Sequence, residues 1–353
     1  MKLGDICKIK YGKDHKKLND GSIPVYGSGG VMRHVDAVLW NKPSVLIPRK
    51  GTLGNLFYVD EPFWTVDTLF WTDIDAAQVV PKYLFYQLKT KDLASLNVGT
   101  AVPSLTTEVL NEVQIDLPSL EKQKQVVEVL GCIDAKIETN TKINGYLAEQ
   151  CEAAVELETG QLDTLSSLCS LATKKVDCRE SDISTYVSTE SLLPGKMGRR
   201  KASSLPQTGK VTAYQTGDTL ISNIRPYFKK IWYADCAGTC SGDVLVFRAK
   251  HPEQAEYLYS CIRNDRFFDY VMKGSKGTKM PRGDKKQMLT YKIVSNPAAQ
   301  TIDFLQTALR QVSITGKESN RLVSLRDALL PKLMSGEIDV SKIDLTQLNS
   351  HLA

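Results

Sequence analysis

The feature that most constrains this chain is a heptad pattern of apolar residues between Pro118 and Gly160. Pro118 and Ser119 mark the start of a helix, and Gly160 marks its end. About 40 residues at about 1.5 Å per residue make a helix of about 60 Å, too long to be buried in one compact domain. Such a helix is either a strut or half of a coiled coil. The seam consists of Val126, Leu130, Ile133, Ile137, Asn140, Asn144, Leu147, Cys151 and Ala154.

Landmarks of the first half of the chain recur at a nearly constant distance in the second half. The distance varies only from 174 to 178 residues, which indicates a tandem repeat. The recurring pairs include Leu46 and Leu220, Asp60 and Asp235, Asp67 and Asp243, Tyr83 and Tyr257, Gly99 and Gly277, Pro103 and Pro281, and Leu130 and Leu305.

A second helical seam follows when the first is moved by 175 residues. Its polar positions Thr315 and Ser319 correspond to Asn140 and Asn144. Since polar residues in a seam specify register, we expect the two helices to pair antiparallel and to meet there. The alternative is a bend in the middle of each helix. The second seam consists of Thr301, Leu305, Ala308, Val312, Thr315, Ser319, Leu322, Arg326 and Leu329.

Short apolar runs alternate with Gly, Pro and Asp turns outside the long helices. In the first repeat we expect strands at 45–47, 56–59, 69–71 and 113–115, and a helix at 81–89. The predicted class is α+β: two tandemly repeated globular domains, each a twisted sheet plus helices, separated by two long helices in an antiparallel, pseudo-two-fold coiled coil. The predicted segments are two globular domains, a central helix, a C-terminal helix and a tail, at 1–118, 161–297, 119–160, 298–338 and 339–353.

Charge is distributed unevenly along the chain. Residues 161–297 hold 22 Lys or Arg and 13 Asp or Glu, whereas residues 119–160 hold 4 and 8. This pattern favours a polyanionic partner for the globular parts, with solvated surface charge as the alternative. The sequence has no long apolar run and no apolar signal at its N-terminus, and its eight cysteines are scattered, so a cytoplasmic protein with free thiols is expected.

Motifs for catalysis and cofactor binding are missing from the sequence. The glycines of 27–32 fail the last position of the dinucleotide-binding pattern, and no phosphate-binding loop or flipped-adenine motif is present. Cys236 and Cys240 have no second pair at zinc-finger distance. We therefore expect no catalytic residue, no metal and no cofactor. The four isolated histidines are His15, His34, His251 and His351.

Four stretches together resemble the specificity subunit of type I restriction-modification systems. They are Leu3-Gly4-Asp5 with its echo at 165–168, Gly99-Thr100 with Pro103, residues 115–123, and residues 325–338. The resemblance covers essentially the whole chain. It implies two target recognition domains that each read half of a bipartite double-stranded DNA sequence, and a helical spacer that docks two methyltransferase subunits.

The resemblance also implies a non-catalytic protein that works with restriction or translocase subunits. Two other hypotheses remain: a stand-alone DNA-modifying or DNA-cleaving enzyme fragment, and a coiled-coil scaffold with sugar- or peptide-binding lobes. On the first helix, we expect an acidic outer face to dock protein, with a solvated face as the alternative. That face consists of Glu128, Asp134, Glu138, Glu149, Glu152 and Glu156.

Base reading requires polar and basic side chains on loops that a sheet holds in place. The second repeat is richer in charge, so we expect it to make more phosphate contacts. In the first repeat the predicted DNA-binding residues are Arg33, Arg49, Lys50, Thr52, Asn55, Thr100 and Ser104. In the second they are Arg199, Arg200, Lys201, Asn223, Arg225, Lys229, Lys230, Lys276, Thr278, Lys279 and Arg282.

Overall fold

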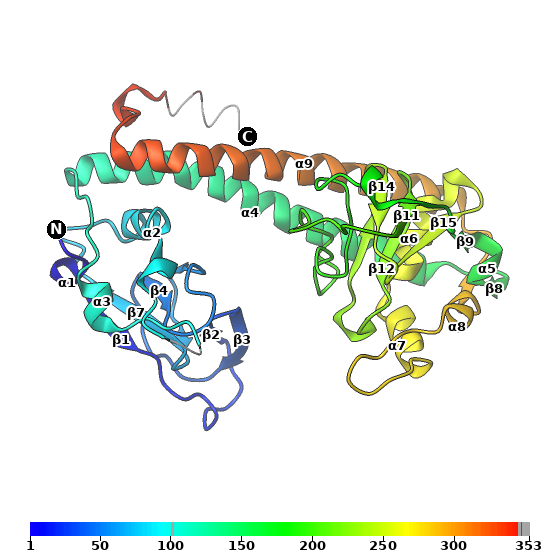
Figure 1. Cartoon of the computed structure of the whole chain (residues 1–353), viewed down its shortest axis with the longest axis horizontal. Helices are drawn as coiled ribbons and strands as arrows, with labels where there is room; N and C mark the ends of the chain where they lie inside the picture. The colour runs from blue at the N-terminus through cyan, green and yellow to red at the C-terminus, as the bar shows by residue number, and fades with distance from the viewer. Residues whose placement is uncertain (100–101, 345–346, 348–353) are drawn as a thin grey trace. The chain divides into compact units, whose positions relative to one another are not determined.

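A computed structural model of the chain describes residues 1–99, 102–344 and 347. The chain divides into two compact units, of which unit 1 comprises Met1–Thr139 with Ser319–Ala353 and unit 2 comprises Asn140–Glu318. The two long helices are α4, Leu120–Leu157, and α9, Ala299–Ser335 (Figure 1). Each long helix therefore contributes one half to each unit.

Unit 1 is built on a four-stranded antiparallel sheet in the order β1-β7-β4-β5 (Figure 1). The strands of a smaller sheet, in the order β3-β2-β6, lie between β1 and β7 in the sequence. The strands are β1 Cys7–Tyr11, β2 Ile23–Gly27, β3 Gly30–Val35, β4 Ser44–Pro48, β5 Phe57–Val59, β6 Trp64–Thr65 and β7 Leu69–Ile74. The short helices are α1 Leu3–Ile6, α2 Pro81–Lys89, η1 Leu93–Leu96, α3 Thr107–Asn111 and η5 Val340–Lys342.

The central strand β4 is buried along its whole length, as its apolar run predicts. Its polar residue Ser44 lies opposite Thr72 of β7, and both are fully buried. The Ser44 hydroxyl donates to the Thr72 carbonyl at 2.8 Å, and the amide of Val45 donates to Thr72 Oγ1 at 2.8 Å. The two hydroxyls thus satisfy backbone groups that the strand ladder leaves unpaired at this end.

Unit 2 repeats the four-stranded sheet in the order β9-β15-β12-β13. The strands are β8 Leu162–Thr164, β9 Cys169–Leu171, β10 Lys175–Asp177, β11 Lys210–Tyr214, β12 Thr219–Ser222, β13 Ile231–Tyr233, β14 Gly238–Cys240, β15 Val244–Ala249 and β16 Lys292–Val294. The short helices are α5 Leu165–Leu168, η2 Cys178–Glu180, η3 Pro226–Phe228, η4 Pro252–Gln254, α6 Ala255–Arg263, α7 Asp265–Lys273 and α8 Lys285–Leu289.

The two units share one strand order, in which β1, β7, β4 and β5 correspond to β9, β15, β12 and β13. Each sheet is preceded by one short helix and followed by an amphipathic helix, α2 or α6. The predicted α+β class with long helices is confirmed. The predicted strand at 113–115 is wrong, because Gln114 forms only an isolated bridge with Lys2.

The long helices pack antiparallel in both units. In unit 1, Asp134 of α4 pairs with Arg326 of α9 at 2.9 Å. In unit 2, Asn140 bonds Glu318 at 2.7 Å and Asn144 accepts a hydrogen bond from Thr315. Residue numbers rise along one helix as they fall along the other, which is the antiparallel order. The expected contact between polar seam positions is confirmed for Asn144, which meets Thr315. Asn140 instead meets Glu318, the residue directly before the seam position Ser319.

Candidate nucleic-acid interface

The β4–β5 connection of unit 1, residues 49–56, holds four of the predicted DNA-binding residues: Arg49, Lys50, Thr52 and Asn55. A bridge joins Lys50 to Ser104. The amide of Gly51 donates to the Pro103 carbonyl at 3.1 Å. Gly51 has a φ of 94°, which glycine adopts without steric cost. The structure therefore brings Ser104 to the connection, while Thr100 lies outside the described residues.

Two predicted arginines of unit 1 are held by contacts within the unit. Arg33 lies on β3, pairs with Asp20 at 2.8 Å and donates to the Leu18 carbonyl at 3.1 Å. The guanidinium of Arg49 lies 5.5 Å from the Tyr11 ring centroid and donates to a backbone carbonyl. Lys50 and Thr52 are exposed, so they are the side chains of this connection most available to a ligand.

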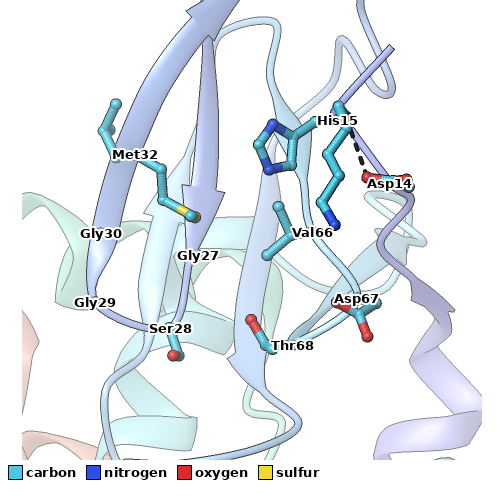
Figure 2. A pocket seen from close by; sticks show the side chains of 12 residues that line it. Asp14, His15, Gly27, Ser28, Gly29, Gly30, Met32, Val66, Asp67 and Thr68 are labelled. Atoms are coloured by element: carbon cyan, nitrogen blue, oxygen red, sulfur yellow. Dashed lines mark hydrogen bonds between the residues drawn. The ribbon is translucent and has the colours of Figure 1, made fainter. Parts of the chain in front are cut away.

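A cavity of about 910 Å³ lies beside this connection in unit 1. Figure 2 shows His15 and Met32 on opposite sides of it, with Ser28, Thr68 and Asp67 at another end. The side-chain amide of Asn55 donates to the Ser28 carbonyl at 2.8 Å, which ties the cavity wall to the connection. Sequence reasoning treated His15 as isolated and missed this cavity, because three segments distant in the sequence form it.

The β12–β13 connection of unit 2, residues 223–230, occupies the equivalent place in its sheet and holds Asn223, Arg225, Lys229 and Lys230. The amide of Arg225 donates to the Pro281 carbonyl at 2.8 Å, as Gly51 does to Pro103. A bridge joins Ile224 to Arg282. Equivalent connections are thus tied in both units to the segment that precedes a short helix, which is α3 in unit 1 and α8 in unit 2.

Backbone strain among the described residues concentrates at this part of unit 2. Its three non-glycine residues with positive φ are Lys196, Arg225 and Lys229, at 62°, 50° and 49°. The left-handed conformation costs roughly 1–2 kcal/mol for each such residue. The amide of Lys196 donates to the Lys229 carbonyl at 2.9 Å, and the amide of Gly195 donates to the Phe228 carbonyl at 2.8 Å. These bonds hold the two loops together and offset the strain.

Charged side chains brace the same loops from α7 and α4. Asp265 pairs with Lys196 at 2.6 Å and with Lys229 at 2.9 Å. The hydrogen bond from Lys196, followed by that from Lys229, holds the pKa of Asp265 below its usual value. Glu152 of α4 pairs with Lys196 at 2.9 Å and also with Arg263. The loop that holds Lys196 is therefore anchored to the part of α4 that belongs to unit 2.

Three acids of the expected docking face of α4 have partners within their own unit. Asp134 accepts a hydrogen bond from Tyr86 at 2.6 Å and pairs with Arg326. Glu152 is bound as described above, and Glu156 accepts a hydrogen bond from Asn264 at 2.8 Å. The side chains of Asp134 and Glu152 are only 25% and 20% exposed, because each one packs against a partner within its own unit, whereas Glu156 is exposed. A docking role for the exposed acids of this face stays a prediction.

The remaining predicted residues of unit 2 differ in their contacts and in their exposure. Arg199 lies 4.5 Å from the Trp232 ring centroid, Arg282 pairs with Asp243 at 3.1 Å, and Lys276 lies 3.9 Å from Asp284. Lys230 donates to a backbone carbonyl at 2.6 Å, and burial lowers its pKa. Asn223 is buried. Of these predicted residues, the exposed ones are Arg200, Lys201, Lys276, Thr278, Lys279 and Arg282.

Groups of three or more His, Cys, Asp or Glu that could hold a metal do not occur among the described residues. All eight cysteines are free thiols. Cys240 is buried in β14, and burial raises its pKa to about 12. Cys236 accepts a hydrogen bond from Arg199 at 3.7 Å. Both cysteines of the suspected pair therefore have structural contacts.

Comparison with known proteins shows what this chain is similar to. The family model described as type I restriction modification DNA specificity domain matches residues 1–148. The EcoDI specificity subunit of a type I restriction enzyme from Escherichia coli is 18% identical over 96% of this chain and 88% of its own. Both comparisons show that this chain is similar to type I specificity subunits. A putative type I specificity subunit of Mycoplasma pneumoniae is 26% identical over 46% of this chain and 54% of that protein.

A crystal structure of a type I restriction-modification S subunit from M. genitalium aligns with a TM-score of 0.55 and 15% identity. The alignment covers 94% of this chain and 95% of that subunit, and it shows that the two share a fold. The chain thus spans about half the length of the M. pneumoniae relative but nearly all of this structure. In the described part of the chain, the helices are too short or too polar to cross a membrane.

Proposed function

We propose that this chain is the non-catalytic DNA-recognition subunit of a type I restriction-modification complex. Each unit would read one half of a bipartite DNA target through the loops at one end of its sheet. The target recognition domains would comprise residues 1–118 and 161–297, with spacer helices over 119–160 and 298–338 and a tail over 339–353. The spacer helices would set the distance between the half-sites and dock methyltransferase subunits.

One observation carries this proposal: both units place basic and polar residues on the same connection of the same sheet. Lys50 and Arg225 lie on connections that are tied by equivalent hydrogen bonds to Pro103 and Pro281. Loops on a rigid sheet are where binding residues concentrate, and two such loops in one chain suit a split target.

Partners and location follow from this proposal. Two methyltransferase subunits would bind the helices, and restriction or translocase subunits would join the complex. The chain itself would need no cofactor, and it would act in the cytoplasm, where the DNA is.

Mapping of methylated adenines in cells with and without the gene tests the proposed function. We expect one split sequence motif to lose its methylation when the gene is deleted and to regain it on complementation. An unchanged set of methylated sites would contradict the proposal. Purified chain that cleaves or methylates DNA without other subunits would instead favour the enzyme alternative.

The salt dependence of binding tests the β4–β5 connection directly. Lys50 follows the end of β4 that carries the connection, whereas the exposed Lys42 precedes the opposite end. If Lys50 contacts a phosphate, Lys50→Ala should make the slope of log K against log salt less negative by about 0.9. Lys42→Ala serves as the matched control and should leave the slope unchanged. Equal slopes for both variants would remove Lys50 from the interface.

A further inference from the structure

Two adjacent aromatic rings are exposed at the tip of the β12–β13 connection. Tyr227 is 48% exposed and Phe228 is 39% exposed, and their ring centroids lie 4.6 Å apart. Pro226, directly before them, is buried. Aromatic side chains contribute most to stability when they are buried, so two neighbouring exposed rings point to a ligand rather than to the core.

The loops around these rings are rich in basic residues, of which four pair with acids of neighbouring elements. No acid among the described residues forms an ion pair within 4.0 Å with the other six, which are Arg199, Arg200, Lys201, Arg225, Lys230 and Lys279. The three loops that meet here, residues 195–201, 225–230 and 276–282, contain four, three and three Lys or Arg and no Asp or Glu. Met197 and Met280 of these loops are 69% and 49% exposed. Apolar side chains within a positive surface suit nucleic acid, since the cations bind phosphates while the rings stack on bases. An apolar site on a protein partner would not require this positive rim.

The aromatic tip is held in place before any ligand binds. The Phe228 carbonyl accepts from the amide of Gly195 at 2.8 Å, and the amide of Lys229 donates to the Pro226 carbonyl at 2.8 Å. Arg225 and Lys229, on either side of η3, both have positive φ. A tip fixed in this way loses little conformational entropy on binding, which favours insertion of its side chains into a ligand.

The equivalent connection of unit 1 lacks this feature. Residues 49–56 include no aromatic residue, and Leu53 is only 4% exposed. Any function of the aromatic tip therefore belongs to unit 2 alone.

We propose that Tyr227 and Phe228 form a wedge that inserts at a base step of duplex DNA and unstacks it. The inference rests on the proposed function and adds a deformation of the DNA to it. Apolar side chains inserted at a base step recover, by contact with the bases, part of the stacking that the step loses. Because unit 1 has no equivalent, only the half-site bound by unit 2 is unstacked, and its sequence preference includes an easily unstacked step.

The test uses the full chain and a duplex that the wild-type chain enriches from random-sequence DNA. 2-Aminopurine, a base whose fluorescence rises on unstacking, is placed at successive positions of that duplex. With wild type we expect the fluorescence to rise at one or two adjacent positions in a single half-site. With Tyr227→Ala/Phe228→Ala we expect no rise, and binding about 10- to 100-fold weaker, the range for losing base–aromatic stacking.

Three controls separate the wedge from other roles. Tyr227→Phe/Phe228→Tyr keeps both rings and should keep both signals, whereas Tyr146→Ala removes a ring that is 66% exposed on α4 and should change neither. Loss of the wedge should leave the salt slope unchanged, while Lys279→Ala should reduce its magnitude by about 0.9. Thermal unfolding checks that each variant is folded.

Wild-type binding without a fluorescence rise at any position would overturn the wedge and leave the proposed function standing. The same holds if the double alanine variant binds DNA normally but loses binding to methyltransferase subunits, because the rings would then be a protein-docking site. A wild-type chain that enriches no duplex would overturn both the wedge and the proposed function.

Discussion

The contact between Glu152 and two buried cations is the most direct test of how unit 2 is held together. The side chains of Glu152, Lys196 and Arg263 are 20%, 12% and 13% exposed. Glu152→Gln keeps the shape of the side chain but leaves both cations without this carboxylate. Removal of one partner from a buried ion pair costs about 3–5 kcal/mol, because the remaining charge stays desolvated.

The expected loss lies at the lower end of this range, since Lys196 keeps Asp265 as a partner at 2.6 Å. For a unit of this size, about 3 kcal/mol lowers the melting temperature by about 6–12 °C. Differential scanning calorimetry of the full chain measures this shift in the transition of unit 2. Calorimetry is suitable because a chain of two units need not unfold in a single step.

Two further variants make the result specific to this contact. Glu149→Gln removes an exposed acid from the same helix and should change the free energy of unfolding by at most about 0.5 kcal/mol. Glu152→Gln combined with Arg263→Met should cost less than the sum of the two single changes, because the two residues are in contact. A shift for Glu152→Gln no larger than that for Glu149→Gln would refute the reasoning.

Three other predictions follow from single contacts. The pKa of Asp265 is lowered in the folded state. Its ion pairs therefore stabilise unit 2 above the unfolded pKa of about 3.9, and this stabilisation is lost as the pH falls through the folded pKa. The difference in melting temperature between wild type and Asp265→Asn should be constant near neutral pH and disappear in acid. Glu158 accepts a hydrogen bond at 3.1 Å from the backbone amide of Ala298, the residue directly before α9, and Glu158→Ala should cost about 1 kcal/mol in thermal unfolding. Tyr86→Phe removes a hydrogen bond of 2.6 Å to the carboxylate of Asp134 and should cost about 2 kcal/mol in the transition of unit 1; losses near zero in either variant would contradict these assignments.

The contact of Glu158 also resolves a difference between the two long helices. The first helix has Glu121 in its first turn, whereas the start of the second has no acidic residue of its own. Glu158, just beyond the end of α4, supplies the carboxylate to the positive end of the α9 dipole. Sequence comparison of the two helix starts could not show this, because the acid comes from a residue 140 positions earlier than Ala298.

The loops that carry the predicted DNA-binding residues could be located from the sequence, but the contacts of their side chains could not. Loops after apolar strands are recognisable from composition, and this placed Lys50 and Arg225 on equivalent connections. The role of each charge was not predictable in the same way. Arg199 carries the same charge as the exposed Arg200, yet its guanidinium stacks on Trp232. The cavity beside His15 was missed for a related reason, since no single stretch of sequence contains its walls.

The sequence by itself determined the long helices, their antiparallel direction and the tandem repeat. Each of these is recorded in the spacing of residues along the chain, as heptads or as a constant offset, and spacing can be read without coordinates. Only the tertiary structure decided which charged side chains are exposed and which ones hold the loops. Glu152 and Arg263 lie 111 residues apart in the sequence. Whether such residues meet depends on the folded backbone. The electrostatic energy of a pair depends on the distance between the two charges in space and on their burial.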